Sequence, residues 1–158
     1  IQERSAALAQ KFSENALDAT DAFSLCVPTE ELAGVPDDVV QATAAAARAD
    51  GLEGHKLTLK MPVYLPVMQF AHSSALRERL YRAYVTRASE QSDRPEFDNA
   101  AVMAELLALR HEEAQLLGHR HFADVSLVPK MADSPEQVVA FLRDLATKAR
   151  PFAEQDLA

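Results

Sequence analysis

The chain has 158 residues, 48% hydrophobic and 25% charged, with only four glycines, a composition that excludes a disordered linker and allows one hydrophobic core. Its formal charge is −8 and its basic residues are spread over several predicted helices, which excludes nucleic acid and anionic membranes as expected partners. No apolar run approaches the roughly 20 residues of a membrane span and no signal peptide is recognisable here, so we expect a soluble, cytoplasmic protein.

The first third of the chain predicts two helices joined by a short turn. Between Gln2 and Phe23, apolar residues recur three and four positions apart and predict one long amphipathic helix, with its inward face formed by Ala9, Phe12, Ala16, Ala19 and Phe23. A short helical turn is expected at Thr29–Leu32. A second helix is expected to begin after Pro36, whose following aspartates suit the helix dipole, and to end near Asp50.

The segment Lys56–Lys60 alternates polar and apolar residues, the period of a strand with one buried face. A lone strand leaves its backbone groups unpaired, so its partner is either a weak strand elsewhere in this chain or a strand outside it. The single cysteine, Cys26, lies in the apolar sequence FSLCV. We therefore expect a buried, inert thiol there in preference to a nucleophile.

Three helices are expected in the middle of the chain. The segment 61–66 should break the strand, with Pro66 in the first turn of a short helix to about Ala71. Ser73 or Ser74 should cap the next helix, which fades near Ser89 into a polar loop at 90–96. Asp98 should cap a helix to Leu117 that Gly118 stops, with its inward stripe formed by Met103, Leu106, Leu107, Ala114 and Leu117.

Two further helices complete the predicted fold. A short helix is expected at His121–Val128, followed by a long one whose start is marked by Ser134, Pro135 and Gln137. Its inward face should hold Val138, Leu142, Leu145 and Ala149, and Pro151 should kink or interrupt it before the pattern resumes to Leu157. The fold class is therefore mainly α, a multi-helix array with at most one small β element near 56–60. The uncapped helix ends and the unpaired strand suggest a single helical region, 1–158, of a larger protein.

Histidines are the first place to look for a metal site. His111 and Glu112 come within one residue of H-E-x-x-H, in which two histidines one helical turn apart bind zinc and the glutamate handles the proton of the attacking water. Gln115 stands where the second histidine would be, and an amide is a poor zinc ligand, so we interpret this as a chance match. His119 and His121 lack an acidic third ligand fixed by spacing and are interpreted as loop or surface histidines.

Other candidates for chemistry also favour structural readings. His55 and His72 lie near element boundaries and belong to no cluster. Arg110 falls inside an apolar stripe, where a packed ion pair is favoured over a substrate clamp. The chain contains no G-x-S-x-G elbow and no glycine-rich phosphate loop. We therefore assign no catalytic, cofactor-binding or metal-binding residue.

Several dissimilar sequence words occur in an order that resembles one known family. They include Lys11–Thr20, the run from Leu57 through Met68, Leu76-Arg77-Glu78, Leu106–Glu112, Ala114–Gly118, Lys130-Met131-Ala132 and Phe141–Leu145. Together these words resemble the zinc oligopeptidases of family M3, of the thimet oligopeptidase and oligopeptidase A kind, over nearly the whole chain.

The resemblance implies a helical half of a neurolysin-like peptidase whose two halves enclose a channel. It implies that the intact protein cuts short peptides with a zinc ion held by an H-E-x-x-H helix and a downstream glutamate. None of those signature residues maps onto this sequence, so the zinc belongs to the parent enzyme and none is expected on this segment. The resemblance thus implies a scaffold role that walls the channel, with the rest of the parent chain and short peptides as partners.

The leading interpretation is a fragment of an M3 zinc oligopeptidase that is inactive alone. Two alternatives to it remain. One is a free-standing helical interaction module that shares the scaffold and has no peptidase activity. The other is a self-contained hydrolase that uses His111, His119 or His121.

Overall fold

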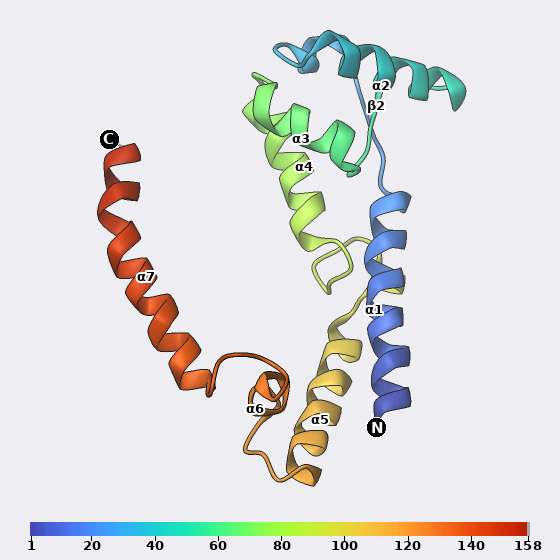
Figure 1. Ribbon diagram of the computed structural model, residues 1–158. Helices are drawn as coiled ribbons and strands as arrows, with labels where there is room; N and C mark the ends of the chain where they lie inside the picture. The colour runs from blue at the N-terminus through green and yellow to red at the C-terminus, as the bar shows by residue number, and fades with distance from the viewer. Residues whose placement is uncertain (158) are drawn as a thin grey trace. The chain divides into compact units, whose positions relative to one another are not determined.

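The computed structural model describes residues 1–157, which form a mainly helical chain with one two-stranded sheet, as the sequence predicts. In chain order (Figure 1) the elements are α1 (Gln2–Ala22), β1 (Leu25–Val27), η1 (Thr29–Leu32), α2 (Asp37–Ala49), β2 (His55–Leu57), α3 (Met61–Phe70), α4 (Ser74–Thr86), η2 (Pro95–Phe97), α5 (Ala100–Leu116), α6 (Phe122–Leu127) and α7 (Pro135–Asp156). The chain divides into two compact units, a central unit of residues 6–104 and a terminal unit of residues 1–5 with those from 105 onward.

The partner of the predicted strand is a second strand within the same chain. β1 and β2 pair in antiparallel fashion with Leu25 opposite Leu57 and Val27 opposite His55. β2 ends at Leu57, three residues earlier than predicted. The prediction for Cys26 is wrong, because the middle residue of β1 points its side chain to solvent while Val27 is buried. Alternation along a strand sends neighbouring side chains to opposite faces.

The core of the central unit lies where α2, α3 and α4 meet the sheet. Eleven buried residues form it: Val27, Leu32, Val35, Val39, Leu57, Leu59, Tyr64, Val67, Ala71, Leu76 and Leu80. Apolar surface removed from water is the main favourable contribution to folding. This unit therefore has a hydrophobic core of its own.

Local signals place most helix ends as predicted. The Ser73 hydroxyl accepts a hydrogen bond of 3.2 Å from the Leu76 amide, and the Ser134 hydroxyl accepts one of 3.1 Å from the Gln137 amide. Gly118 has φ +76° and ends α5, because the amides of Gly118 and His119 bond back to the carbonyls of Gln115 and Ala114. This is a Schellman motif, which favours glycine at its left-handed position.

Two proline predictions need correction. Pro66 does not lie in the first turn of a helix, because α3 begins at Met61 with Pro62 in its first turn and Pro66 inside the helix. α7 continues through Pro151 to Asp156 without interruption. A proline inside a helix costs one backbone hydrogen bond but does not prevent helix formation when flanking residues support it.

The predicted inward faces are only partly right. In α1 the buried residues are Leu8, Asn15 and Ala19, so Phe12 and Ala9 lie outside the buried face. In α5 only Leu106 and Ala114 of the predicted stripe are buried. No residue of α7 is buried, and Leu142 and Leu145 remain 56% and 46% exposed. Within residues 1–157, no helix is both long enough and apolar enough to cross a bilayer.

Candidate functional site

The residues that nearly match a zinc motif lie at the end of α5. His111 and Glu112 are both exposed on this helix. Gln115 occupies the position of the missing histidine, and its side-chain amide donates to the backbone carbonyls of His119 and Arg120, at 3.4 and 3.1 Å. The amide therefore stabilises the turn that follows the helix, a structural task that explains a glutamine at this position.

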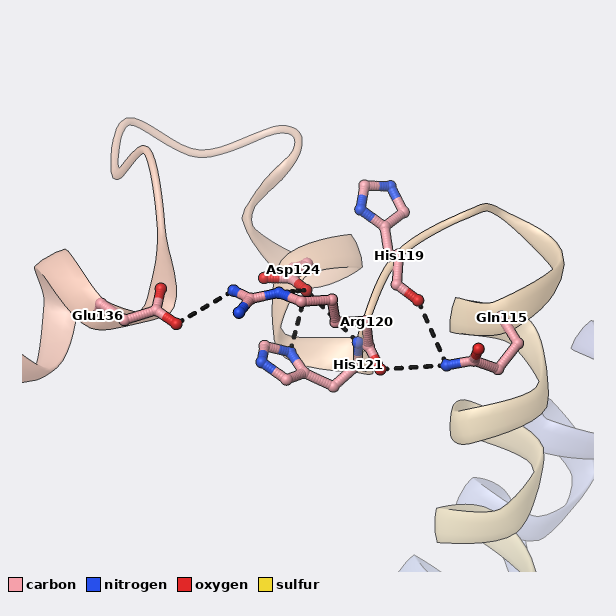
Figure 2. Close-up of polar contacts among 6 residues, drawn as sticks. All are labelled: Gln115, His119, Arg120, His121, Asp124 and Glu136. Carbon is pink, nitrogen blue, oxygen red and sulfur yellow. Dashed lines mark hydrogen bonds and ion pairs between the residues drawn. The ribbon is translucent and has the colours of Figure 1, made fainter.

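Beyond Gly118, polar side chains gather at the start of α6 (Figure 2). His121 Nδ1 lies 3.2 Å from Asp124 Oδ2, and Arg120 Nε lies 3.8 Å from the same oxygen. The His121 backbone amide also donates to Asp124 Oδ2 at 3.4 Å. Asp124, in the first turn of α6, thus accepts hydrogen bonds at the positive end of the helix dipole. In Figure 2 the imidazole of His119 points away from this group.

Arg120 joins α6 to α7 within the terminal unit. Its Nη2 donates to Glu136 Oε1 at 3.1 Å. The pKa of Glu136 is lowered, first by a hydrogen bond from its own backbone amide in the first turn of α7 and then by Arg120. Glu136 is fully exposed, so the contact orients the two helix starts with little effect on stability. Next to it an open cleft of about 550 Å³ is lined by His119, Arg120 and Asp124 among others.

The donor set of this region does not fit a zinc ion. Zinc sites in proteins use three or four converging histidine, cysteine or carboxylate ligands. Among residues 1–157, no group of three or more such side chains is placed to hold a metal. His111 and His119 do not converge with His121 and Asp124, and the one nearby amide, Gln115, is engaged with backbone carbonyls.

The prediction of an ion pair for Arg110 is wrong. Arg110 is exposed, and its guanidinium lies over the ring of Phe122, 5.2 Å from the centroid, in the range of a cation–π contact. The ring belongs to α6, so the contact joins α5 and α6 in the terminal unit. An exposed arginine over an aromatic ring needs no carboxylate, because its donors reach water.

His55 and His72 have separate structural surroundings. His55 is buried in β2, where Nε2 lies 3.0 Å from the Thr29 hydroxyl and Nδ1 lies 3.2 Å from the Thr43 hydroxyl and 3.1 Å from the Val40 carbonyl. These contacts tie the sheet to η1 and α2. His72 is exposed, and its backbone amide donates to the Ala33 carbonyl at 2.8 Å.

Sequence reasoning missed a buried amide pair, Asn15 and Asn99, in the central unit. Both are almost fully buried, and Asn15 Nδ2 donates to Asn99 Oδ1 at 2.9 Å. The available signal was an asparagine inside the apolar pattern of a helix, where this residue type is disfavoured without a specific partner. The position of that partner could not be read from the pattern.

Comparison with known proteins identifies the chain. The sequence model of peptidase family M3 matches residues 67–158, more than half of the chain. The chain belongs to peptidase family M3. Oligopeptidase A of Escherichia coli (strain K12) is 51% identical over 160 residues, an alignment that covers 100% of this chain and 24% of that protein. The probable cytosolic oligopeptidase A of Arabidopsis thaliana is 40% identical over 165 residues, covering 99% of this chain and 23% of that protein.

A more distant relative shares the same stretch. The dipeptidyl carboxypeptidase of Escherichia coli (strain K12) is 31% identical over 160 residues, covering 100% of this chain and 23% of that protein. The chain therefore spans about a quarter of the length of the curated relatives it matches. Membership of peptidase family M3 confirms the resemblance found in the sequence words.

Proposed function

We propose that this chain forms part of the non-catalytic helical scaffold of a zinc metallo-oligopeptidase, and that the intact protein hydrolyses short peptides. Membership of peptidase family M3 and the name oligopeptidase A of the relatives support the peptidase activity. The scaffold is proposed to wall the channel through which peptides reach the zinc. The observation that carries the proposal is that a chain of this family has no converging metal ligands within residues 1–157.

Zinc is proposed to be held by polypeptide other than this stretch. The near motif on α5 has one imidazole, from His111, and an amide, from Gln115, that is used to bind the His119 and Arg120 carbonyls. Bound zinc supplies a Lewis acid and a nucleophilic water for peptide hydrolysis. The role of these 158 residues is instead to fold, to pack against the rest of the enzyme and to limit which peptides enter.

The apolar face of α7 supports a packing role. Val138, Leu142, Leu145, Ala149 and Phe152 recur at helical spacing on one face. Leu142, Leu145 and Phe152 are 56%, 46% and 68% exposed. Burying such a side chain is worth about 1.5–3 kcal/mol, so a further part of the parent peptidase is the proposed occupant of this face.

Hydrolysis by the chain alone tests the absence of a site. The purified 158-residue chain is mixed with a quenched fluorescent peptide, with and without added zinc. We expect no turnover beyond buffer in either case. Chelator-sensitive turnover by this chain would contradict the proposal and would favour the self-contained hydrolase with His111, His119 or His121.

A charge placed on the α7 face tests the scaffold role against the free-standing interaction module. Leu145→Lys is introduced into the protein expressed from its own gene, with Thr147→Lys on the opposite face of α7 as the matched control. If the face packs against further peptidase chain, Leu145→Lys lowers the melting temperature and the peptidase rate, while the control leaves both unchanged. Equal behaviour of the two variants would favour a module that works without a packed neighbour.

The cellular setting is proposed to be the cytoplasm. The net charge of −8 disfavours nucleic acid and anionic membranes as partners. The Arabidopsis relative is named as a probable cytosolic oligopeptidase A, which agrees with this setting. Fractionation of cells that produce the protein, followed by detection with an antibody, tests it, and recovery in the membrane pellet would contradict it.

A further inference from the structure

An open cleft of about 650 Å³ lies in the central unit. It is lined by residues from the end of α1, from the start of β1, from α4 and from the loop that follows α4. A volume of this size falls in the range of pockets that bind small molecules. All of its lining residues belong to one compact unit.

Four arginines line the cleft in an otherwise acidic chain. Arg79, Arg82, Arg87 and Arg94 line it, and Asp93 is the one acidic residue among its lining side chains in the described chain. The whole chain carries 24 acidic and 16 basic residues, so four arginines on the wall of one cleft depart from its general composition. Every cation is an arginine, whose planar donor fork matches a carboxylate better than a lysine does.

Three of the four arginines already have carboxylate partners. Arg79 pairs with Glu31 at 3.1 Å, Arg82 with Glu78 at 3.1 Å, and Arg94 with Glu96 at 3.4 Å. Solvent-exposed pairs of this kind contribute little to stability.

Arg87 differs because its position is set by an aromatic ring. Its guanidinium lies 3.8 Å from the centroid of Tyr84, and Tyr84 stacks on Tyr64 with 4.4 Å between centroids. Arg87 also donates a hydrogen bond to the Tyr84 carbonyl. Within residues 1–157 it has no carboxylate partner. It is thus a preorganised cation with donors left for a ligand.

The backbone next to Arg87 is also held in an uncommon conformation. Ala88 is buried with φ +53°, and its carbonyl accepts a hydrogen bond of 3.1 Å from the Asn99 amide. A non-glycine residue in this region is strained and persists where surrounding contacts require it. The turn at Ala88 ends α4 and leads into the loop that carries Arg94 to the cleft.

The opposite wall of the cleft is apolar. Phe23 and Leu25 are half-buried there, and Leu59 is buried. A free phosphate would use the arginines alone and leave this wall in water. A carboxylate attached to an apolar side chain would use both, as at the end of a short peptide.

We propose that this cleft binds the carboxylate of a short peptide, with Arg87 receiving the carboxylate and Phe23 and Leu25 contacting the adjacent apolar side chain. The proposal goes beyond the scaffold function, because it assigns a ligand-binding site to this chain itself. It concerns binding and requires no hydrolysis. The cleft proposal would therefore hold even if the scaffold proposal were wrong.

Fluorescence anisotropy with the 158-residue chain tests the cleft. The probe is a short peptide with fluorescein at its N-terminus and a C-terminal leucine, either with a free carboxylate or as the amide. Mass spectrometry confirms that the peptide stays intact. We expect the free carboxylate to bind about tenfold or more tightly than the amide, since a charge-assisted arginine pair is lost with the amide.

Substitutions then locate the binding. Arg87→Gln is expected to weaken binding of the free carboxylate about tenfold, and Arg94→Gln to weaken it by a smaller factor. Arg48→Gln, on the exposed side of α2 and outside the cleft, is the matched control and should bind as the original chain does. Circular dichroism checks that each variant folds. If Arg87→Gln does not fold, Arg94→Gln, which lies on the exposed loop, is used to test the cleft in its place.

Three results would overturn the proposal. One is equal binding of the carboxylate and the amide, and another is unchanged binding by both Arg87→Gln and Arg94→Gln. The third is binding of inorganic phosphate that depends on Arg87 while neither peptide binds, since this would assign the cleft to a different anion. Displacement of the peptide by excess acetate would support it.

Discussion

The side-chain amide of Asn15, inside α1, donates a hydrogen bond of 2.9 Å to the side-chain carbonyl of Asn99, which directly precedes α5. Asn99 in turn donates through its own side-chain amide to the Phe12 carbonyl at 3.1 Å and through its backbone amide to the Ala88 carbonyl at 3.1 Å. One buried residue thus joins α1, the turn after α4 and the start of α5. Buried polar groups of this kind stabilise a fold only while their partners remain.

Removing Asn99 should therefore destabilise the central unit. Asn99→Ala deletes two side-chain hydrogen bonds and leaves the buried Asn15 amide without its acceptor, which should lower the free energy of unfolding by about 2–4 kcal/mol. Urea unfolding followed by circular dichroism measures it. Gln41→Ala, an exposed amide on α2, should change stability by less than about 0.5 kcal/mol. Equal effects of the two variants would show that the Asn15–Asn99 contact is not required.

A methyl group at Gly34 should be far more costly than one at Gly51. Both glycines have positive φ, +92° and +71°. A Cβ at Gly34 would collide with the Phe70 carbonyl and the His72 ring, whereas a Cβ at Gly51 would meet nothing within 4 Å. Gly51→Ala should cost about 1–2 kcal/mol for its backbone conformation alone, and Gly34→Ala should cost clearly more. Thermal unfolding compares the two, and similar melting temperatures would contradict the prediction.

The Arg4–Glu105 pair should make one carboxyl titrate low. Arg4 Nε and Nη2 donate to the two oxygens of Glu105 at 2.6 and 2.7 Å. This hydrogen bonding lowers the pKa of Glu105 below its ordinary value. A lowered folded-state pKa contributes stability above the unfolded-state pKa, and that contribution is lost as pH falls through the folded-state value. The Arg4 and Glu105 side chains are 57% and 43% exposed, so solvent screens the pair and the contribution is small.

NMR titration of the Glu105 carboxyl carbon checks this prediction. Arg4→Gln should raise the pKa of Glu105 toward its ordinary value. Arg150→Gln, which removes the partner of Glu154 on α7, should leave Glu105 unchanged. An unaltered Glu105 titration in Arg4→Gln would mean that the two-oxygen contact does not persist in solution.

Cys26 should react with a thiol reagent in the folded state. Its side chain is exposed on β1, opposite Lys56 in the sheet register. Access is one requirement for thiol reactivity, so the rate of modification in buffer should resemble that in urea. The chain contains one cysteine, which makes Cys26→Ser a complete control. Protection from the reagent until the chain unfolds would instead favour the buried thiol that the apolar neighbours suggested.

Helix positions follow from the sequence because their signals are local. Ser73, Ser134 and Gly118 act on backbone groups within one helical turn, so their residue types and spacing suffice to place the helix ends. The family words and the missing second histidine at Gln115 are equally readable from order and spacing. The sequence was therefore sufficient to predict the mainly α fold and peptidase family M3. The absence of catalytic and metal-binding residues from this chain stays a prediction.

Contacts between distant segments were decided by the tertiary structure. β1 is too short to show a period, and its pairing with β2 depends on residues about 30 positions further along the chain. The partner of Asn15 is 84 positions away, and the four arginines meet in one cleft only because α4 and the following loop fold against the end of α1. Helix capping depends on neighbours in the chain, whereas burial and charge clustering depend on neighbours in space, which no local pattern specifies.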